Sequence, residues 1–379
     1  DSGVLMRYGF DGMRQGHWKA KELEYAIQSR FDVKHAQLLS SGTAAVSLAL
    51  ASAGIGSGDE VIMPCFTFVA SFEAILMLGA IPILVDIDDT LTLDIKSVQA
   101  AITPKTKAIM PVHMCGSMAD LDALKYICEM HNLILIEDAC QAIGGTYKGK
   151  ALGTIGDLGC FSFDYVKTVT CGEGGVVITN NKEFYTSADQ FSDHGHDHQG
   201  NDRGAETHPV LGYNFRISEL NAAVGVAQFS RLDEFLAIQK KHYSIIRNEL
   251  SSISGVTFRT VPEGGEESYA FLNFFLDDLD TARKVNQAFK TNGIDVCFHY
   301  FDNNWHYIRK WDHLKTQKSL FPLSQEVKEG LSYLKTKTFE QSDHFIGRNL
   351  SCLIKLSWTE AEVKQRAQTM AKLIREVIA

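Results

Sequence analysis

Short apolar runs alternate with amphipathic stretches over the first half of the chain. The apolar runs lie at residues 36–39, 60–63, 81–85, 108–112, 133–136, 160–163 and 176–179. Runs of this length, separated by stretches with helical periodicity, predict repeated strand–helix–strand units. We therefore expect an α/β fold with a mostly parallel, seven-stranded type of sheet covered by helices. A ligand site is expected at the carboxyl ends of its strands.

The pattern changes in the second half of the chain. Residues 218–250 contain no Pro and a single Gly, Gly225, which predicts one long helix. A smaller α+β pattern follows, with predicted strands at 269–276, 294–299 and 353–356, a helix at 281–290 and a last helix from Glu360. Thr359 and Glu362 have the spacing of a capping box at the start of that helix. We predict a large domain over residues 1–235 and a smaller C-terminal domain over residues 236–379.

Composition and charge narrow the function. The 379 residues suffice for about two domains, and 45% of them are hydrophobic. The 37 basic and 46 acidic residues give a net charge of -9, which speaks against a nucleic acid partner. The longest apolar run, residues 74–85, is shorter than the ~20 residues of a membrane helix, so no membrane partner is expected. Eight cysteines without a CxxC spacing indicate buried thiols in a reducing compartment and predict a cytoplasmic protein.

The segment SSGTAA, residues 40–45, is the first candidate for chemistry. It follows the first predicted strand and opens a helix, so the backbone amides of Gly42, Thr43 and Ala44 lie unpaired at the positive end of that helix. Such a helix end binds phosphate. A plain N-cap followed by small residues for packing is the alternative interpretation.

Two further motifs follow predicted strands. Glu137 and Asp138 end the apolar run 133–136, with Gln141 three residues on, and Asp138 is either an N-cap or the partner of a cationic ring nitrogen. In FSFDYVK, residues 161–167, Lys167 comes just after a buried strand. Partial desolvation there lowers the pKa of a lysine toward its neutral, nucleophilic form, whereas a solvated loop lysine is the simpler alternative.

These motifs, in this order, resemble those of the fold-type I pyridoxal-phosphate enzymes, and within them those of the DegT/DnrJ/EryC1/StrS sugar aminotransferases. Six segments carry the resemblance: LLSSGTAAVSLAL, GDEVIMPCFTFVAS, LGAIPILVDID, PVHMCGSMADLDAL, LIEDACQAIGGTYKGKALGTIGDLGCFSFDYVKTVTCGEGGVVITN and LGYNFRISELNAAVG. The resemblance implies the fold-type I aminotransferase architecture, with pyridoxal 5'-phosphate (PLP) as cofactor.

The resemblance also implies a role for each matching residue. Lys167 would form the Schiff base with PLP, and Asp138 would keep the pyridine nitrogen protonated. A lysine at position 167, where a dehydrating family variant has histidine, favours transamination. The further cofactor contacts would be Phe68 on the ring face, Gln141 at the ring hydroxyl, and Ser162 with the amides of Gly42, Thr43 and Ala44 at the phosphate. Asn214 would reach the phosphate in the neighbouring subunit, so a homodimer with shared active sites is expected.

A histidine-rich loop occupies residues 193–208. We expect no metal there, because a Gly-containing loop does not fix ligand geometry. A solvated surface loop and the lining of a polar substrate pocket are the two other interpretations. The residues available to receive a substrate carboxylate are His194, His196, His198, Arg203, Arg216, His299 and His306.

Two segments indicate the substrate. Residues 191–206 and 303–307 are similar to a branch of the family that forms 8-amino-3,8-dideoxy-D-manno-octulosonate, and Asp302-Asn303-Asn304 departs from the proline turn of many relatives. The similarity implies transfer of the amino group of L-glutamate to the C8 aldehyde of 3,8-dideoxy-8-oxo-D-manno-octulosonate, in lipopolysaccharide sugar biosynthesis. A nucleotide-linked keto-deoxyhexose is the alternative acceptor. A non-catalytic, cofactor-binding regulatory protein is the alternative of a different class.

Overall fold

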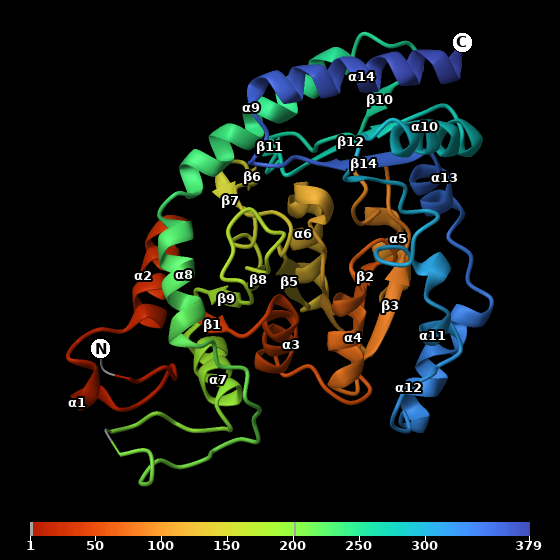
Figure 1. Cartoon of the computed structure of the whole chain (residues 1–379). Coiled ribbons are helices and arrows are strands. Elements are labelled where there is room, and N and C mark those ends of the chain that lie inside the picture. The colour runs from red at the N-terminus through yellow and green to blue at the C-terminus, as the bar shows by residue number, and fades with distance from the viewer. Residues whose placement is uncertain (1–2, 201) are drawn as a thin grey trace.

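A seven-stranded sheet forms the centre of the larger part of the molecule (Figure 1). The computed structural model describes residues 3–200 and 202–379. The strand order is β1-β9-β8-β5-β4-β2-β3. The strands are β1 (His35–Leu39), β2 (Glu60–Pro64), β3 (Ile81–Val85), β4 (Thr106–Ile109), β5 (Ile134–Asp138), β8 (Leu158–Ser162) and β9 (Gly175–Thr179). β9 runs opposite to the other six strands of this sheet, so the prediction of a mostly parallel sheet is confirmed.

Helices cover both faces of this sheet. Successive strand residues alternate between two apolar cores: Val61 and Met63 lie in one core, and Ile62 lies in the other. The first core includes residues of α3 (Gly42–Ser52), α4 (Val69–Met77) and α7 (Lys182–Ser192). The second includes residues of α2 (Lys19–Phe31), α5 (Ile95–Ala101), α6 (Leu121–His131) and α8 (Glu219–Phe229). A short helix, α1 (Asp11–Arg14), precedes them.

The predicted single helix over residues 218–250 is wrong. The chain forms α8 and then α9 (Leu232–Leu250), with a break at Ser230 and Arg231. The two helices pack on different partners, α8 against α2 and α9 against α14 (Glu360–Ile378), as Figure 1 shows. The chain therefore passes from the larger to the smaller part of the molecule at this break. The sequence does not reveal the break, because no Pro or Gly lies there.

A four-stranded antiparallel sheet forms the smaller part, in the order β10-β12-β14-β13. Its strands are β10 (Thr257–Phe258), β12 (Phe271–Phe275), β13 (Cys297–Phe298) and β14 (Asn349–Leu353). Residues of α9, α14 and α10 (Leu279–Thr291) complete its apolar core. The predicted strand at 353–356 is displaced, since β14 ends where that prediction begins. The capping box of Thr359 and Glu362 at the start of α14 is confirmed.

The segment between β13 and β14 returns to the larger sheet. It contains η2 (Ile308–Lys310), α11 (Asp312–Lys315), α12 (Gln325–Gly330), η3 (Leu331–Lys335) and α13 (Glu340–Arg348). The Trp311 ring lies 4.7 Å from that of Phe72 in α4. The Tyr333 hydroxyl donates to Pro82 O at 3.0 Å and accepts from Leu84 N at 2.8 Å. The division at residue 235 stays a prediction, and the larger core also contains residues of this returning segment.

A small three-stranded sheet joins the two parts. Its order is β11-β6-β7, with β6 (Thr146–Tyr147) and β7 (Lys150–Ala151) from the larger part and β11 (Gly265–Glu266) from the smaller one. The short helix η1 (Met114–Gly116) lies nearby in the contact between the parts, where Ser268 N donates to Gly116 O at 2.9 Å. No helix in the described ranges is long and apolar enough to cross a membrane.

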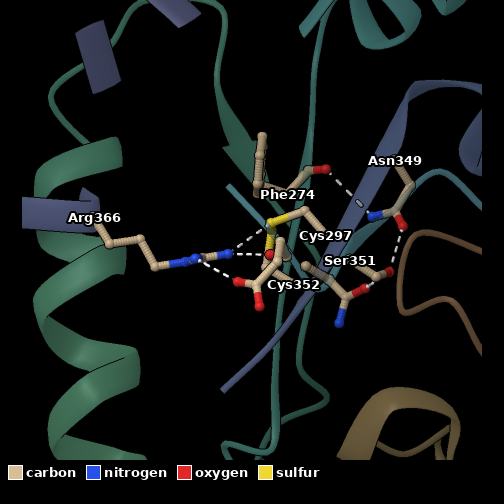
Figure 2. The surroundings of a disulfide bond; sticks show 8 residues. Phe274, Cys297, Asn349, Ser351, Cys352 and Arg366 are labelled. Carbon is tan, nitrogen blue, oxygen red and sulfur yellow. Dashed lines mark hydrogen bonds and ion pairs between the residues drawn. A yellow bond between two sulfur atoms is a disulfide. The ribbon is translucent and has the colours of Figure 1, made fainter. Parts of the chain in front are cut away.

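Cys297 and Cys352 form a disulfide bond between β13 and β14 (Figure 2). The two residues face each other in the strand pair, with their Cα atoms 4.1 Å apart. Arg366 points toward the bond, with Nη2 3.9 Å from Cys297 Sγ. The prediction that all the cysteines are thiols is wrong for this pair, which is separated by 55 residues and has no spacing that reveals it. The free cysteines are Cys65, Cys115, Cys128, Cys140, Cys160 and Cys171.

Candidate active site

Asp138 lies at the carboxyl end of β5, with 4% of its surface exposed. The Ser71 hydroxyl, in the first turn of α4, donates to Asp138 Oδ2 at 2.8 Å. Cys140 N donates to Asp138 Oδ1 at 3.2 Å. A buried carboxylate held by a hydroxyl and an amide presents a fixed negative charge, which suits a cationic partner.

The neighbouring Glu137 serves the structure instead. Its carboxylate is fully buried and accepts from Gly153 N at 2.8 Å and from Ile155 N and Gly156 N at 2.6 Å. The remaining contact is with His113 Nε2 at 2.8 Å. Because side chains alternate along a strand, adjacent acids point to opposite faces of the sheet. The geometry therefore separates the roles of Glu137 and Asp138.

The start of α3 and the end of β8 form a narrow cradle. A Cβ atom added to Gly42 would lie 2.6 Å from Ser162 Cβ and 2.8 Å from Ser162 Oγ, so glycine permits this close approach. Ser41 caps α3, and its Oγ accepts from Ala44 N at 3.0 Å. The amides of Gly42 and Thr43 have no protein partner in the part of the chain that the structure describes. The sequence-predicted phosphate contacts thus meet, with the Ala44 amide already engaged by the cap.

Lys167 lies in the turn after β8. Its Nζ is 3.7 Å from Asp164 Oδ2, and 18% of the side chain is exposed. Burial raises the pKa of the nearby Cys140 thiol, and the charge of Asp138 raises it further, while the charge of Lys167 opposes the change. Because β5 and β8 are parallel neighbours, Asp138 at the end of β5 and Lys167 after β8 lie at the same edge of the sheet.

Gln141, His306 and Phe68 form a wall of the same region. Gln141 Oε1 accepts from Cys115 N at 3.0 Å, and Gln141 Nε2 lies 3.4 Å from His306 Nε2. The Phe68 ring is 5.5 Å from that of His306 and remains 45% exposed, which leaves a ring face for stacking. Burial lowers the pKa of His306 to about 3, with a further contribution from the charge of Lys167. His306 is therefore neutral at physiological pH, and its contact with a substrate carboxylate stays a prediction.

Arg259 supports this wall from the smaller part of the molecule. Its guanidinium is buried, pairs with Glu267, and donates to Met114 O at 2.9 Å and Cys115 O at 2.6 Å. Cys115 has a left-handed backbone with φ of 53°, and its amide is the donor to Gln141. Ser71 and Arg259 are both absent from the sequence prediction. Apart from Ser71 lying within the family-like segment PCFTFVAS, no local pattern marks either residue.

Three predicted substrate residues converge on Asp193, whose side chain is fully buried. Asp193 accepts from Arg203 Nη1 at 2.8 Å and lies 2.9 Å from His198 Nε2, and Arg216 also pairs with it. Burial disfavours the charged form of His198, but its bonds to Asp189 and Asp193 raise its pKa to about 9. Arg203, Arg216 and His198 thus form one charged cluster, and their contact with a substrate stays a prediction.

The remaining predicted substrate histidines lie in different surroundings. His299 is buried, with Nε2 2.8 Å from Gly347 O and Nδ1 3.1 Å from Asp302 Oδ2. Both nitrogens are engaged within the chain, and substrate binding by His299 stays a prediction. His196 pairs with Glu206 at 2.8 Å, and His194 is exposed. Substrate binding by His194 and His196 stays a prediction.

Asn214 lies on the surface beside the Asp193 cluster. It is exposed and forms an isolated antiparallel bridge with Asp193. Its placement allows contact outside its own chain, and its role at a neighbouring phosphate stays a prediction. No group of three or more His, Cys, Asp or Glu residues able to hold a metal ion lies within residues 3–200 and 202–379.

The residues present fit PLP. A phosphate suits the glycine cradle, since free amides and the Ser162 hydroxyl meet there. The buried carboxylate of Asp138 suits a protonated ring nitrogen, and Lys167 supplies an amine at the same edge of the sheet. This sheet, with its lysine, aspartate and phosphate cradle, defines the class of pyridoxal-phosphate-dependent aminotransferases.

The family model of the DegT/DnrJ/EryC1/StrS aminotransferase family matches residues 12–339, and the chain belongs to this family. The GDP-perosamine synthase of Vibrio cholerae is 36% identical over 295 residues, which are 77% of this chain and 78% of that enzyme. The GDP-perosamine synthase of Caulobacter vibrioides is 43% identical over 221 residues, and this match spans 58% of each chain.

A solved structure shows the same architecture. The PLP form of Spr1654 from Streptococcus pneumoniae has a TM-score of 0.81 and 25% identity, and the match covers 100% of this chain and 94% of that one. The same protein is also solved in a PMP form. The family, the fold class, the enzyme class and the cofactor predicted from the sequence are thereby confirmed.

Proposed function

We propose that this sugar aminotransferase transfers the amino group of L-glutamate to the C8 aldehyde of 3,8-dideoxy-8-oxo-D-manno-octulosonate. The product is 8-amino-3,8-dideoxy-D-manno-octulosonate, and 2-oxoglutarate is released. Such an amino sugar acid serves lipopolysaccharide biosynthesis, which we place in the cytoplasm. The acceptor is proposed from the similarity of residues 191–206 and 303–307 to that branch of the family.

The observation that carries the acceptor is the charge of the cluster around Asp193. Three cations, His198, Arg203 and Arg216, face the carboxylates of Asp189 and Asp193. His198 is charged at neutral pH because its pKa is raised to about 9 by these carboxylates, despite its burial. Glu206 also faces Arg203, so the three cations are balanced by three carboxylates. A cluster without excess positive charge is poorly suited to the several negative charges of a nucleotide diphosphate, which favours an acceptor with a single carboxylate.

We assign the chemical steps to residues at the edge of the sheet. When bound, PLP supplies an electron sink for charge that develops on the substrate carbon. The Lys167 amine accepts a proton from one carbon atom and returns it to another. Asp138, held by Ser71, would face the ring nitrogen, Ser162 would bind the phosphate, and Phe68 would pack on the ring face.

A nucleotide-linked keto-deoxyhexose is the second candidate acceptor. The GDP-perosamine synthases similar to this chain favour it, since GDP is part of the product that their name gives. A diphosphate needs several cationic donors, and Arg203 and Arg216 are already paired with Asp193. The two candidates therefore differ in what the Asp193 cluster must bind. The intact Lys167, Asp138 and Ser162 count against the regulatory alternative.

A half-reaction separates the two candidates. Excess L-glutamate added to the PLP-loaded enzyme is expected to bleach the visible absorption band of bound PLP. After removal of glutamate, the enzyme is offered either the 8-oxo-octulosonate or a GDP-linked keto-deoxyhexose. Recovery of the band with the octulosonate alone supports the proposal, and recovery with the nucleotide sugar alone overturns it. Absence of bleaching would contradict glutamate as the donor.

The active unit is proposed to be a homodimer in which Asn214 acts on the neighbouring site. Exposed apolar residues surround Asn214, with Leu211 93% and Tyr213 61% exposed. Mixing Lys167→Ala with Asn214→Ala chains after denaturation and refolding tests the shared site. Random pairing should restore about a quarter of the wild-type activity, because half of the dimers are hybrids with one intact site. No recovery, with wild-type chains refolding normally, would show that Asn214 acts within its own chain.

A further inference from the structure

His306 occupies a fixed position next to the reacting edge of the sheet. Thr67 N donates to His306 O at 2.8 Å, and the antiparallel bridge between Phe66 and Tyr307 lies next to this bond. The Tyr300 ring lies 4.6 Å from the imidazole. The side chain is thus held on its backbone and on its ring face, and only 8% of the residue is exposed.

The hydrogen bonds of Gln141 determine the tautomer of His306. Gln141 Oε1 accepts from Cys115 N at 3.0 Å, so the amide nitrogen of Gln141 is the end that faces the imidazole. An amide nitrogen can only donate. His306 Nε2, 3.4 Å away, must therefore be the acceptor, and the proton of the neutral ring lies on Nδ1.

The Nδ1–H group has no partner in the described part of the chain. It is buried, and none of the described residues accepts its hydrogen bond. A buried donor without an acceptor is costly, by about 1–3 kcal/mol. The ring is neutral because burial and the charge of Lys167 lower the pKa of His306 to about 3. An uncharged donor at this place suits an oxygen atom that enters with a ligand.

We propose that His306 is a specificity-determining residue that accepts from Gln141 through Nε2 and donates through Nδ1–H to an oxygen atom of the acceptor sugar. We assign the sugar contact to Nδ1 because Nε2 already faces the Gln141 amide and Nδ1 points in another direction. The inference rests on the aminotransferase reaction and applies to either candidate sugar. It differs from an electrostatic role, since the ring binds its ligand without a positive charge.

Two substitutions separate the two nitrogens. A glutamine amide takes the place of Nε2, so His306→Gln keeps an acceptor for Gln141 and loses the Nδ1 donor. An asparagine amide takes the place of Nδ1, so His306→Asn keeps that donor and loses the acceptor. His306→Gln should raise KM for the acceptor sugar about three- to tenfold, as for one lost hydrogen bond. Its KM for L-glutamate and its PLP absorption band should stay unchanged.

His306→Asn should show the opposite pattern. Gln141, which we expect at the ring hydroxyl of PLP, loses its acceptor, so the absorption band of bound PLP should shift while KM for the sugar stays nearly unchanged. An equal rise of both KM values in His306→Gln would overturn the proposal. A readout independent of substrate is the 15N NMR spectrum of histidine-labelled enzyme at pH 7, assigned with His306→Gln. Protonated Nδ1 and unprotonated Nε2 are expected, and a protonated Nε2 would overturn the tautomer even if the function proposed above holds.

Discussion

Ser71 offers a direct test of how the enzyme holds Asp138. Ser71 is buried, with 1% of the residue exposed, and its hydroxyl donates to Asp138 Oδ2 at 2.8 Å. Ser71→Ala removes this donor and leaves Cys140 N on the other oxygen at 3.2 Å. The carboxylate keeps its charge but loses one of two constraints on its orientation. We expect PLP to bind more weakly and turnover to fall.

The size of the effect follows from the type of hydrogen bond. A bond to a charged group contributes about 1.5–3 kcal/mol, and about 1.4 kcal/mol corresponds to a factor of ten. Because Cys140 N still constrains the carboxylate, we expect the lower end of this range. Ser71→Ala should therefore reduce kcat/KM about tenfold. The loss should appear in the glutamate half-reaction, before any sugar is present.

Thr67 provides a matched control. Its hydroxyl lies 2.7 Å from Ser71 Oγ, and Thr67→Val is nearly isosteric. This variant removes a neighbour of Ser71 while the Ser71–Asp138 bond remains, so we expect less than about a threefold loss. Rates are followed by stopped-flow absorbance, and circular dichroism checks the fold. Equal rates for Ser71→Ala and Thr67→Val would refute the assignment of Ser71 as the residue that holds Asp138.

Lys167→Ala should abolish turnover, measured as 2-oxoglutarate release, and any retained transamination at the wild-type rate would contradict the role of this amine. Asp138→Asn should still bind PLP, seen by its absorbance after gel filtration, but turn over at least about a hundredfold more slowly because the negative charge is lost; near-normal rates would show that the ring nitrogen has another partner. His198 has a pKa raised from 6.5 to about 9 by Asp189 and Asp193 against the effect of burial, so its contribution to stability is complete below pH 6.5 and is lost as the pH rises through 9. In urea unfolding, His198→Asn should cost on the order of 2–3 kcal/mol at pH 6 and clearly less at pH 10, and an equal cost at both pH values would contradict the charged pair.

The first half of the fold was predictable because each strand of the larger sheet buries nearly every residue. Five consecutive residues of β9 are buried, which gives a continuous apolar run. The position of β14 was not predicted correctly, because buried Asn349 and Ser351 interrupt its apolar pattern. Their polar groups are satisfied inside the sheet, where Asn349 Nδ2 donates to Phe274 O at 3.3 Å and Ser351 pairs with Asn273. Burial of polar side chains depends on partners far away in the sequence.

The candidate site shows the same limit. Gly42, Asp138 and Lys167 each lie at or shortly after the carboxyl end of a strand. Their position at one edge of the sheet could therefore be predicted from the order of the elements. The Gln141–His306 contact joins residues 165 positions apart, and no local pattern predicts it. The neutral state of His306 arises from burial, which the sequence near residue 306 does not reveal.

The segment between β13 and β14 carries His306, whereas the residues that we assign to PLP come from other parts of the chain. Residues that we assign to PLP chemistry lie before position 220, whereas the turn at 302–305 leads into His306 from the other end of the sequence. Trp305 within this turn is 55% exposed, so its side chain is not needed to fill the core. The turn is anchored through Asn304 O, which accepts from the buried Trp311 Nε1, and it lies far along the chain from Lys167 and Asp138. If His306 contacts the sugar as we propose, substitutions in this turn should change the choice of sugar while the residues at the edge of the larger sheet stay the same.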